Sequence, residues 1–362
     1  MASVLSPRAL LRGLAVFVAL SVLVYVFLVL RDRNPAEVLQ AAREVRWGWV
    51  LVGVGLASMD WIGGGLRNWV IVRHVHPDPP LSGMILAGGM GAWAGYLTPL
   101  NSGSGPMMMY GMRRAGVPIP VAVTSTLMTF IATVAFFALA GPLAIVLGGG
   151  RSLGHHGDVL GLSLYDLFLG SLSMFVGLGL LFVAIIIFPR YIRDLLHRLA
   201  ERIGQRSRRV AARLEGLRAG IDRSHESFVA FNSRKGWVSL LWATLLSGPS
   251  HANKLLAGYV ALRAVGIQAN FVDVLLLQTM ITFLLYFAPT PGASGIAELL
   301  SATVMSSVYL PPAVAPVYTL IWRAILSYFT LIFGFFVFYR WLQHPLKGLD
   351  DQPDSLVVST GG

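Results

Sequence analysis

The stretch "FAPTPGASGIAELL" (residues 287–300) places two prolines, two glycines and one glutamate inside a long apolar region. Proline removes a backbone donor and glycine tolerates unusual dihedral angles, so a helix that enters this stretch is expected to break. Non-helical backbone persists at membrane depth only where protein or a wet cavity surrounds it. A break with an acid, Glu298, beside it therefore predicts a functional element inside a membrane protein.

The composition around this stretch is that of a membrane protein. The chain has 362 residues, of which 55% are hydrophobic and only 12% charged, about half the charged fraction of a soluble domain. The absence of cysteine excludes disulfides, thiolate metal sites and a cysteine nucleophile. We predict an all-α polytopic membrane protein with six full transmembrane helices and two re-entrant helical hairpins. The helices are predicted at about 14–30, 47–72, 118–148, 160–188, 237–262 and 312–339, and the hairpins at 81–116 and 271–310.

The basic residues predict the orientation of the chain. Residues 190–235 hold twelve of the 28 lysines and arginines, which indicates a cytoplasmic linker and places both termini in the cytoplasm. Apolar residues recur in it at helical spacing, for example Ile192, Leu195 and Leu199, which favours amphipathic helices on the inner leaflet over nucleic-acid binding. The predicted segments are an N-terminal helix with an external loop (1–46), a first repeat with its linking helix (47–189), the basic linker (190–235), a second repeat (236–344) and a flexible tail (345–362).

An internal repeat connects the opening stretch to an earlier one. A shift of 190 residues sets "GYLTPLNSGSG" (95–105) over "LYFAPTPGASG" (285–295). Because three full crossings separate the copies, they are predicted to have opposite orientations, as in the inverted repeats of many transporters. The alternative is that both segments are ordinary loops between short helices. The aligned pairs are Tyr96 with Tyr286, Pro99 with Pro289, Ser104 with Ser294 and Gly105 with Gly295.

Two motifs resemble those of a known family. "TPLNSGSGPMMMYGMRRAGV" (98–117) and "PTPGASGIAE" (289–298) are similar to motifs of the flippase-like transmembrane domain of lysylphosphatidylglycerol synthases and its stand-alone relatives. The first motif departs from the family pattern, with Ser104 in place of the usual glycine and Gly105 in place of the usual glutamine. The resemblance covers about residues 10–342.

This resemblance implies a function and a location. It implies movement of a lipid between the leaflets of the plasma (inner) membrane of a prokaryote. The substrates implied are an anionic or aminoacylated phospholipid, a hopanoid or a polyprenyl lipid. Because only a short tail follows residue 342, we expect a chain without the aminoacyl-transferase domain, which would not make the lipid itself.

Charged groups within the apolar segments are the candidate site. "SMDWIGGGLRNW" carries Asp60 and Arg67, seven residues apart and so on nearly one helix face. "SGPSHANKLL" carries Lys254 at the equivalent place in the second repeat, and Arg323 lies within the last span. The predicted substrate-binding residues are Glu298, Arg323, Lys254, Arg67, Asp60, Ser104, Gly105, Ser294, Gly295 and Tyr286.

Each candidate has a functional and a structural interpretation. Half-helices that begin near Gly105 and Gly295 would offer free N–H groups to a lipid phosphate. The three buried cations would add positive charge, and Glu298 would meet a cationic headgroup or take up a proton. Structurally, Arg323 would only neutralise Glu298, and Asp60 would only pair with Lys254. Arg67 would extend towards the membrane surface, and His251 is interpreted as a hydrogen-bonded core residue.

Three functions compete at this stage. A lipid flippase or scramblase fits the resemblance, whereas an ion-coupled transporter of small solutes fits inverted repeats equally well. An intramembrane lipid-modifying enzyme is disfavoured, because the acids at depth, Asp60, Asp166 and Glu298, lie in separate segments without a histidine–carboxylate spacing. We expect no enzymatic activity, cofactor or metal site. The expected partners are membrane lipids and not nucleic acid, and a homo-oligomer is compatible with the sequence.

Overall fold

The computed structural model is helical throughout the residues it describes, with no β-strand among them. These residues are 7–144, 164–188, 231–286 and 288–343, with positions 146, 190, 191, 194, 198 and 229. Most of the predicted basic linker (190–235) and the predicted tail (345–362) lie outside them. The first-half elements are α1 (Pro7–Val24), η1 (Tyr25–Leu30), α2 (Pro35–Arg43), α3 (Trp47–Ala57), α4 (Met59–Val75), α5 (Leu81–Tyr96), η2 (Pro99–Asn101), α6 (Ser104–Arg114) and α7 (Ile119–Ala144). The remaining elements are α9 (Leu164–Ile187), α12 (Arg234–Ser250), α13 (Ala252–Ala264), α14 (Phe271–Tyr286), η4 (Pro291–Ala293), α15 (Ile296–Val308), α16 (Ala315–Arg323), η5 (Ala324–Tyr328) and α17 (Phe329–Gln343).

Four helical segments of the described chain are long and apolar enough to cross a membrane. They are Leu10–Phe27, Trp47–Val75, Ile119–Leu143 and Ala315–Phe338, and shorter apolar helical stretches occupy Leu172–Leu181 and Phe271–Tyr286. The multi-pass membrane protein predicted from composition is therefore supported, although not every one of the six predicted full spans reaches this length and apolarity.

Two predicted spans are interrupted in the same way. The predicted span 47–72 is divided at Ser58 into α3 and α4, and the predicted span 237–262 is divided at His251 into α12 and α13. Pro249 lies just before the second interruption, where its missing N–H weakens the helix. Each interruption lies beside the polar residues that the sequence singled out.

These two interrupted spans pack side by side. α4 packs along α12 while α3 packs along α13, so the two spans run in opposite directions. The contact is close because Gly63 has no side chain: a Cβ there would lie 2.7 Å from the backbone of Ser250. Residues from both halves of the sequence are thereby brought side by side at the centre of the molecule.

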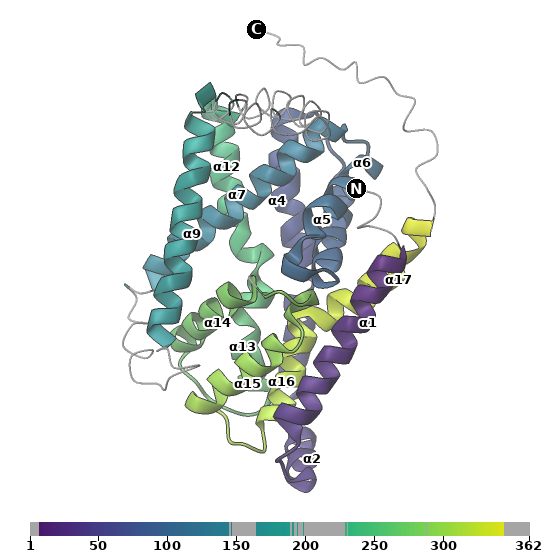
Figure 1. The fold of residues 1–362 in the computed structure, drawn as a ribbon, viewed down its shortest axis with the longest axis vertical. Helices are drawn as coiled ribbons and strands as arrows, with labels where there is room; N and C mark the ends of the chain where they lie inside the picture. The colour runs from purple at the N-terminus through teal and green to yellow at the C-terminus, as the bar shows by residue number, and fades with distance from the viewer. Residues whose placement is uncertain are drawn as a thin grey trace.

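The two segments predicted to be broken form helical hairpins. α5 and α6 pack against each other in the upper half of Figure 1, and α14 and α15 lie in the lower half. Their breaks, η2 and η4, are in contact, and the Leu100 N–H donates to the Ala288 carbonyl at 3.3 Å. The two breaks thus contact each other, with Pro291 and Ala293 of η4 buried and the residues of η2 exposed.

The two hairpins match more closely than their sequences suggest. α5 and α14 each have 16 residues and are separated by 190 positions, as the sequence alignment predicted. The breaks match instead at 192: Leu100 and Asn101 have φ of 52° and 56°, and Gly292 and Ala293 have φ of 54° and 55°. α15 likewise begins 192 positions after α6. The structural counterpart of Gly295 is thus Gly103 and not Gly105.

We expect replacement of Gly292 by alanine to destabilise the folded protein. A left-handed conformation costs a residue with a side chain about 1–2 kcal/mol, and the new Cβ would lie 2.7 Å from the Phe17 ring and 2.8 Å from the Tyr96 carbonyl. Thermal unfolding of the detergent-solubilised protein measures the loss. Gly55→Ala is the control, because a Cβ there meets no atom within 4 Å, and an equal loss in both variants would contradict this account.

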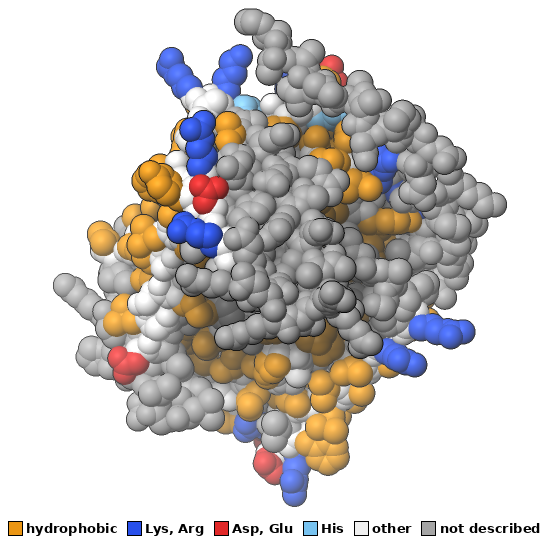
Figure 2. Space-filling model, turned by 45° about the horizontal axis from the view of Figure 1, so that its top comes forward, with side chains coloured by type: hydrophobic (Ala, Val, Ile, Leu, Met, Phe, Trp, Pro, Cys, Tyr) orange, Lys and Arg blue, Asp and Glu red, His pale blue; other side chains and the backbone are white. Residues whose placement is uncertain are grey.

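Many large apolar side chains are exposed on the described surface. Figure 2 shows orange hydrophobic side chains at the left and bottom of the view, with blue lysines and arginines projecting at the top left, right and bottom. Among the exposed apolar residues are Leu51, Leu139, Leu180 and Phe336, each at least 66% exposed. Such a surface is expected to face hydrocarbon rather than water.

Candidate functional site

Asp60 is the centre of the first buried polar cluster. Its Oδ1 accepts a hydrogen bond from the Lys254 ammonium at 2.6 Å, in an ion pair whose side chains are 4% and 15% exposed. Its Oδ2 accepts from the Asn253 amide at 2.8 Å and from the Tyr96 hydroxyl at 2.9 Å. One carboxylate therefore joins three donors, which offsets the cost of burying its charge.

The interruptions in the two antiparallel spans bring Asp60 and Lys254 together. Asp60 is the second residue of α4, after the interruption at Ser58, and Lys254 is in the first turn of α13, after the interruption at His251. Tyr96 is the last residue of α5, next to the first hairpin break. The consecutive helices α4 and α5 thus meet α13, from the second half of the sequence, at one carboxylate.

Glu298 and Arg323 form the second buried cluster. The Arg323 Nε donates to Glu298 Oε1 at 2.8 Å, and both side chains are at most 1% exposed. The Arg323 guanidinium also donates to the Gly292 carbonyl at 3.3 Å and to the Ser21 hydroxyl at 3.4 Å. The pair is thus completely enclosed and bonded directly to the second hairpin break.

Protein groups accept from the N–H that precedes each half-helix. The Gly295 N–H, before α15, donates to Glu298 Oε2 at 2.8 Å, and the Gly103 N–H, before α6, donates to the Thr98 hydroxyl at 2.8 Å. For α15 this geometry argues against the expectation that its N–H groups bind a lipid phosphate. A carboxylate already occupies the positive end of α15, so an anion there would meet repulsion.

Arg67 points into the protein and not towards the membrane surface. Its guanidinium donates to the hydroxyls of Thr133 at 2.6 Å and Ser247 at 3.2 Å, on α7 and α12. Its Nε is buried without a hydrogen-bond partner. The expectation that Arg67 extends to the interface is therefore wrong, because two inward hydroxyls hold its side chain between helices.

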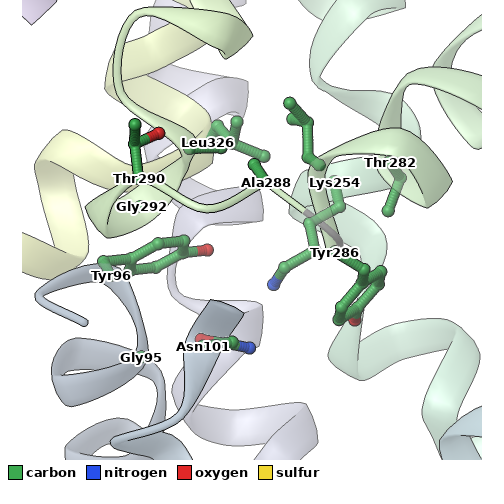
Figure 3. Close-up of a pocket in the computed structure, with 12 residues that line it drawn as sticks. Gly95, Tyr96, Asn101, Lys254, Thr282, Tyr286, Ala288, Thr290, Gly292 and Leu326 are labelled. Carbon is green, nitrogen blue, oxygen red and sulfur yellow. The ribbon is translucent and has the colours of Figure 1, made fainter. Parts of the chain in front are cut away.

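A small cavity lies between the two hairpin breaks (Figure 3). Its volume is about 60 Å³, enough for a few water molecules and too small for a lipid headgroup. Figure 3 shows the Lys254 and Tyr96 side chains directed into the space between the upper and lower ribbons. Its polar lining residues are Tyr96, Asn101, Lys254, Thr282, Tyr286 and Thr290.

Apart from Arg67, the predicted site residues fall into three groups. Asp60, Lys254 and Tyr286 lie at or beside the cavity, and Glu298, Arg323 and Gly295 form the second cluster. The third group lines neither. Ser104 packs against Gly91 of α5, a Cβ on Gly105 would contact only Thr126 of α7, and the buried Ser294 hydroxyl has no hydrogen-bond partner.

His251 is a core residue, as the sequence indicated. Its Nδ1 lies 2.8 Å from the Ser247 carbonyl and 3.0 Å from the Ser250 hydroxyl, and the residue is 6% exposed. Its ring packs edge-on to Phe137 at 5.2 Å. These contacts account for a histidine at an interrupted helix without assigning it proton transfer.

Sequence reasoning missed three polar residues of the centre. Tyr96 was noted only as a repeat position, Asn253 was one of the polar residues of "SGPSHANKLL" (247–256) but not a predicted site residue, and Asn101 was not noted. Tyr96 and Asn253 bind Asp60, and Asn101 lines the cavity. The available signal was an uncharged polar side chain within an apolar segment. Such residues are common in membrane helices and carry no sign of charge, so the sequence alone ranks them below ionisable groups.

The described residues contain no group of three or more histidine, aspartate or glutamate side chains placed to hold a metal ion. Comparison with known proteins gives one family. The family model described as "Lysylphosphatidylglycerol synthase TM region" matches residues 11–334. No curated protein and no solved structure gives a significant match.

Proposed function

The chain belongs to the family of the lysylphosphatidylglycerol synthase transmembrane region, and from this premise we propose that it moves a polar or charged lipid between membrane leaflets, in the manner of a flippase or scramblase. One observation carries the proposal: both buried ion pairs are bonded to the hairpin breaks. Asp60 accepts from Tyr96 beside the first break, and Arg323 donates to Gly292 in the second. Ionisable groups at membrane depth are costly and mark pathways of polar substrates.

We propose the architecture of an inverted repeat with six full spans and two re-entrant hairpins. Three features support it: α5 and α14 are of equal length, the two breaks share a left-handed pair of residues, and the breaks meet. The opposite course of α3–α4 and α12–α13 agrees with a pseudo-twofold relation. In transporters of this plan the substrate site lies where discontinuous helices meet near the midplane.

The proposed mechanism begins from a centre without room for a headgroup. A cavity of about 60 Å³ excludes a lipid headgroup, so the two hairpins must separate for passage, breaking the bond between Leu100 and Ala288. Once the cavity widens, Lys254 exchanges Asp60 for the lipid phosphate. Asp60 in turn meets a cationic part of the headgroup, if the lipid carries one. Exchange of partners replaces the hydration that the headgroup loses, while the lipid tails stay in hydrocarbon.

We place the protein in the plasma (inner) membrane with both termini in the cytoplasm. The helix ends next to the linker carry Arg190, Arg234 and Lys235, and α6 ends at Arg113 and Arg114. α1 begins and α17 ends beside each other in Figure 1, on the right of the view. Basic residues gathered at one end favour the cytoplasmic side.

The charges of the centre favour an anionic or aminoacylated phospholipid among the implied substrates. Lys254 and Arg67 are cations for a phosphate, and the Arg67 guanidinium donates to the hydroxyls of Thr133 and Ser247, which leave its charge without neutralisation. The Asp60 carboxylate is an anionic partner for the ammonium group of an aminoacylated headgroup. A hopanoid or polyprenyl lipid with a charged headgroup meets the same requirement.

The cavity supports a second candidate function, an ion-coupled transporter of small solutes. A space of about 60 Å³ with the Lys254 side chain in its lining suits a small ion better than a lipid. An intramembrane enzyme is a weaker candidate, because Asp60 and Glu298 each face a cation at 2.6 Å and 2.8 Å. A carboxylate held in this way is a poor general base.

Reconstitution distinguishes these functions. We expect the protein, purified into liposomes with fluorescent phospholipids of several headgroups, to raise the fraction bleached by dithionite above that of protein-free liposomes. The increase arises because inner-leaflet lipids reach the reductant outside. If the fraction stays at the protein-free level for every headgroup, while a solute or ion flux appears in the same vesicles, the transporter of small solutes replaces the lipid function.

A further inference from the structure

A second hollow lies outside the described site, on the flank of the molecule. It is a groove of about 340 Å³ between α1 on one side and α16, η5 and α17 on the other, the elements that run together on the right of Figure 1. Its rim is formed by four exposed aliphatic side chains, and its floor includes the buried Phe17 and Ser21. The rim residues are Val18, Val22, Leu320 and Ile332.

The groove opens towards hydrocarbon. Its lining residues belong to Leu10–Phe27 and Ala315–Phe338, two of the segments able to cross a membrane. Only 22% of the first segment is buried in the protein, the lowest share of the four, so α1 lies at the outer edge of the molecule. The groove is therefore reached from the bilayer interior and not from water.

The floor of the groove is also the wall of the Glu298–Arg323 cluster. The Arg323 guanidinium lies over the Phe17 ring at 5.1 Å and over the Tyr328 ring at 5.5 Å. It donates to the Ser21 hydroxyl at 3.4 Å. Three groove residues thus touch the same buried cation, and one layer of side chains separates the groove from the ion pair.

The shape of the groove favours a flexible chain over a partner helix. Transmembrane helices pack closely where small residues let their backbones approach, but the rim here consists of branched side chains such as Val18, Val22 and Ile332. A narrow apolar hollow with a hydroxyl at its floor instead fits a hydrocarbon chain with a polar end. Membrane lipids supply such chains on every side of a spanning protein.

We infer that this groove binds one alkyl chain of a membrane lipid, with the polar end of that lipid on the side of Ser21 and Arg323. That the bound lipid is the one transported rests on the proposed function. In this arrangement the tail is held against α1 while the headgroup approaches the second ion pair. α1 is then the boundary between the bilayer and the transport centre.

Photo-crosslinking tests the groove directly. A phospholipid with a diazirine in its acyl chain is incorporated with the purified protein in nanodiscs and irradiated, and tryptic peptides are read by mass spectrometry. Cleavage after Arg12, Arg31, Arg323 and Arg340 releases the groove segments as residues 13–31 and 324–340. We expect adducts at Val18 and Val22 in the first peptide and at Tyr328 and Ile332 in the second.

A filled groove should lose these adducts. In the double variant Val18→Trp/Val22→Trp two indole rings occupy the hollow, so the adducts in residues 324–340 are expected to vanish. The control is Val16→Trp/Leu23→Trp, on exposed α1 positions (44% and 54%) outside the groove, which should keep them. Adducts spread evenly over exposed α1 positions, or adducts that survive the filling, would overturn the inference.

The bleaching assay with the same variants separates this inference from the proposed function. Slower bleaching in the filled variant alone supports binding of the transported lipid. Loss of adducts with unchanged bleaching contradicts the claim that the groove binds the transported lipid, because the groove then holds a lipid that is not transported. Groove adducts in a protein that moves no lipid would keep the binding site and reject the transport function.

Discussion

Replacement of Arg323 by methionine is expected to reduce stability more than any other single change at the centre. Glu298 is at most 1% exposed and would lose its cation, and removal of one partner of a buried pair costs about 3–5 kcal/mol. The Gly292 carbonyl would lose a donor as well. We expect a lower unfolding temperature in detergent, a lower yield of folded protein and no lipid movement. Arg43→Met, on the exposed face of α2, is the control.

A double variant decides whether this pair is only structural. Glu298→Gln with Arg323→Met removes both charges, and a neutral replacement of a buried ion pair is often tolerated. We expect much of the lost stability to return, since the glutamine oxygen can still accept from the Gly295 N–H. Lipid movement should remain absent. A folded double variant that moves lipid at the original rate would show that the pair serves the fold alone.

Replacement of Asp60 by asparagine is expected to abolish lipid movement while leaving a weakened fold. Three donors converge on this carboxylate, and an amide has only one oxygen to accept from them. The Lys254 ammonium would then lose its anionic partner. Because its side chain is 15% exposed, we expect a loss of about 3 kcal/mol in folding stability, the lower end of the range for breaking a buried ion pair. Thermal unfolding and the bleaching assay measure the two effects.

Two further variants are needed to interpret the Asp60→Asn result. Glu37→Gln changes an exposed acid of α2 in the same way and should leave stability and bleaching unchanged. Asp60→Asn with Lys254→Met removes the unpaired cation, so stability should partly recover without recovery of transport. Normal bleaching in the Asp60→Asn protein would refute the proposed exchange of Lys254 between Asp60 and a lipid phosphate.

Much of the fold could be predicted because it depends on local chemistry. Long apolar runs predict membrane helices, and the prolines and glycines of 287–300 predict the break that η4 forms. The repeat at 190 gave the equal lengths of α5 and α14. The alignment missed that the offset between the two copies rises from 190 to 192 positions from the breaks onward. Two extra residues between α14 and η4 leave no mark in a short, weakly similar alignment.

The candidate site was predictable only in part. Asp60, Lys254, Glu298 and Arg323 could be found because a charge in an apolar segment is conspicuous by itself. Their pairing was foreseen as a structural alternative and is present in both cases. For Arg67 the sequence left an inward and an outward course open, and it did not indicate the acceptors Thr133 and Ser247, which lie on other helices.

The sequence by itself determined that this is a helical membrane protein with two broken segments and a few buried charges. Those properties follow from residue type and from neighbours a few positions away. Only the tertiary structure decided that the two breaks touch and that a groove along α1 reaches Arg323. The physical reason is that partners of a buried group are chosen by helix packing, which joins residues such as Asp60 and Lys254 across nearly two hundred positions.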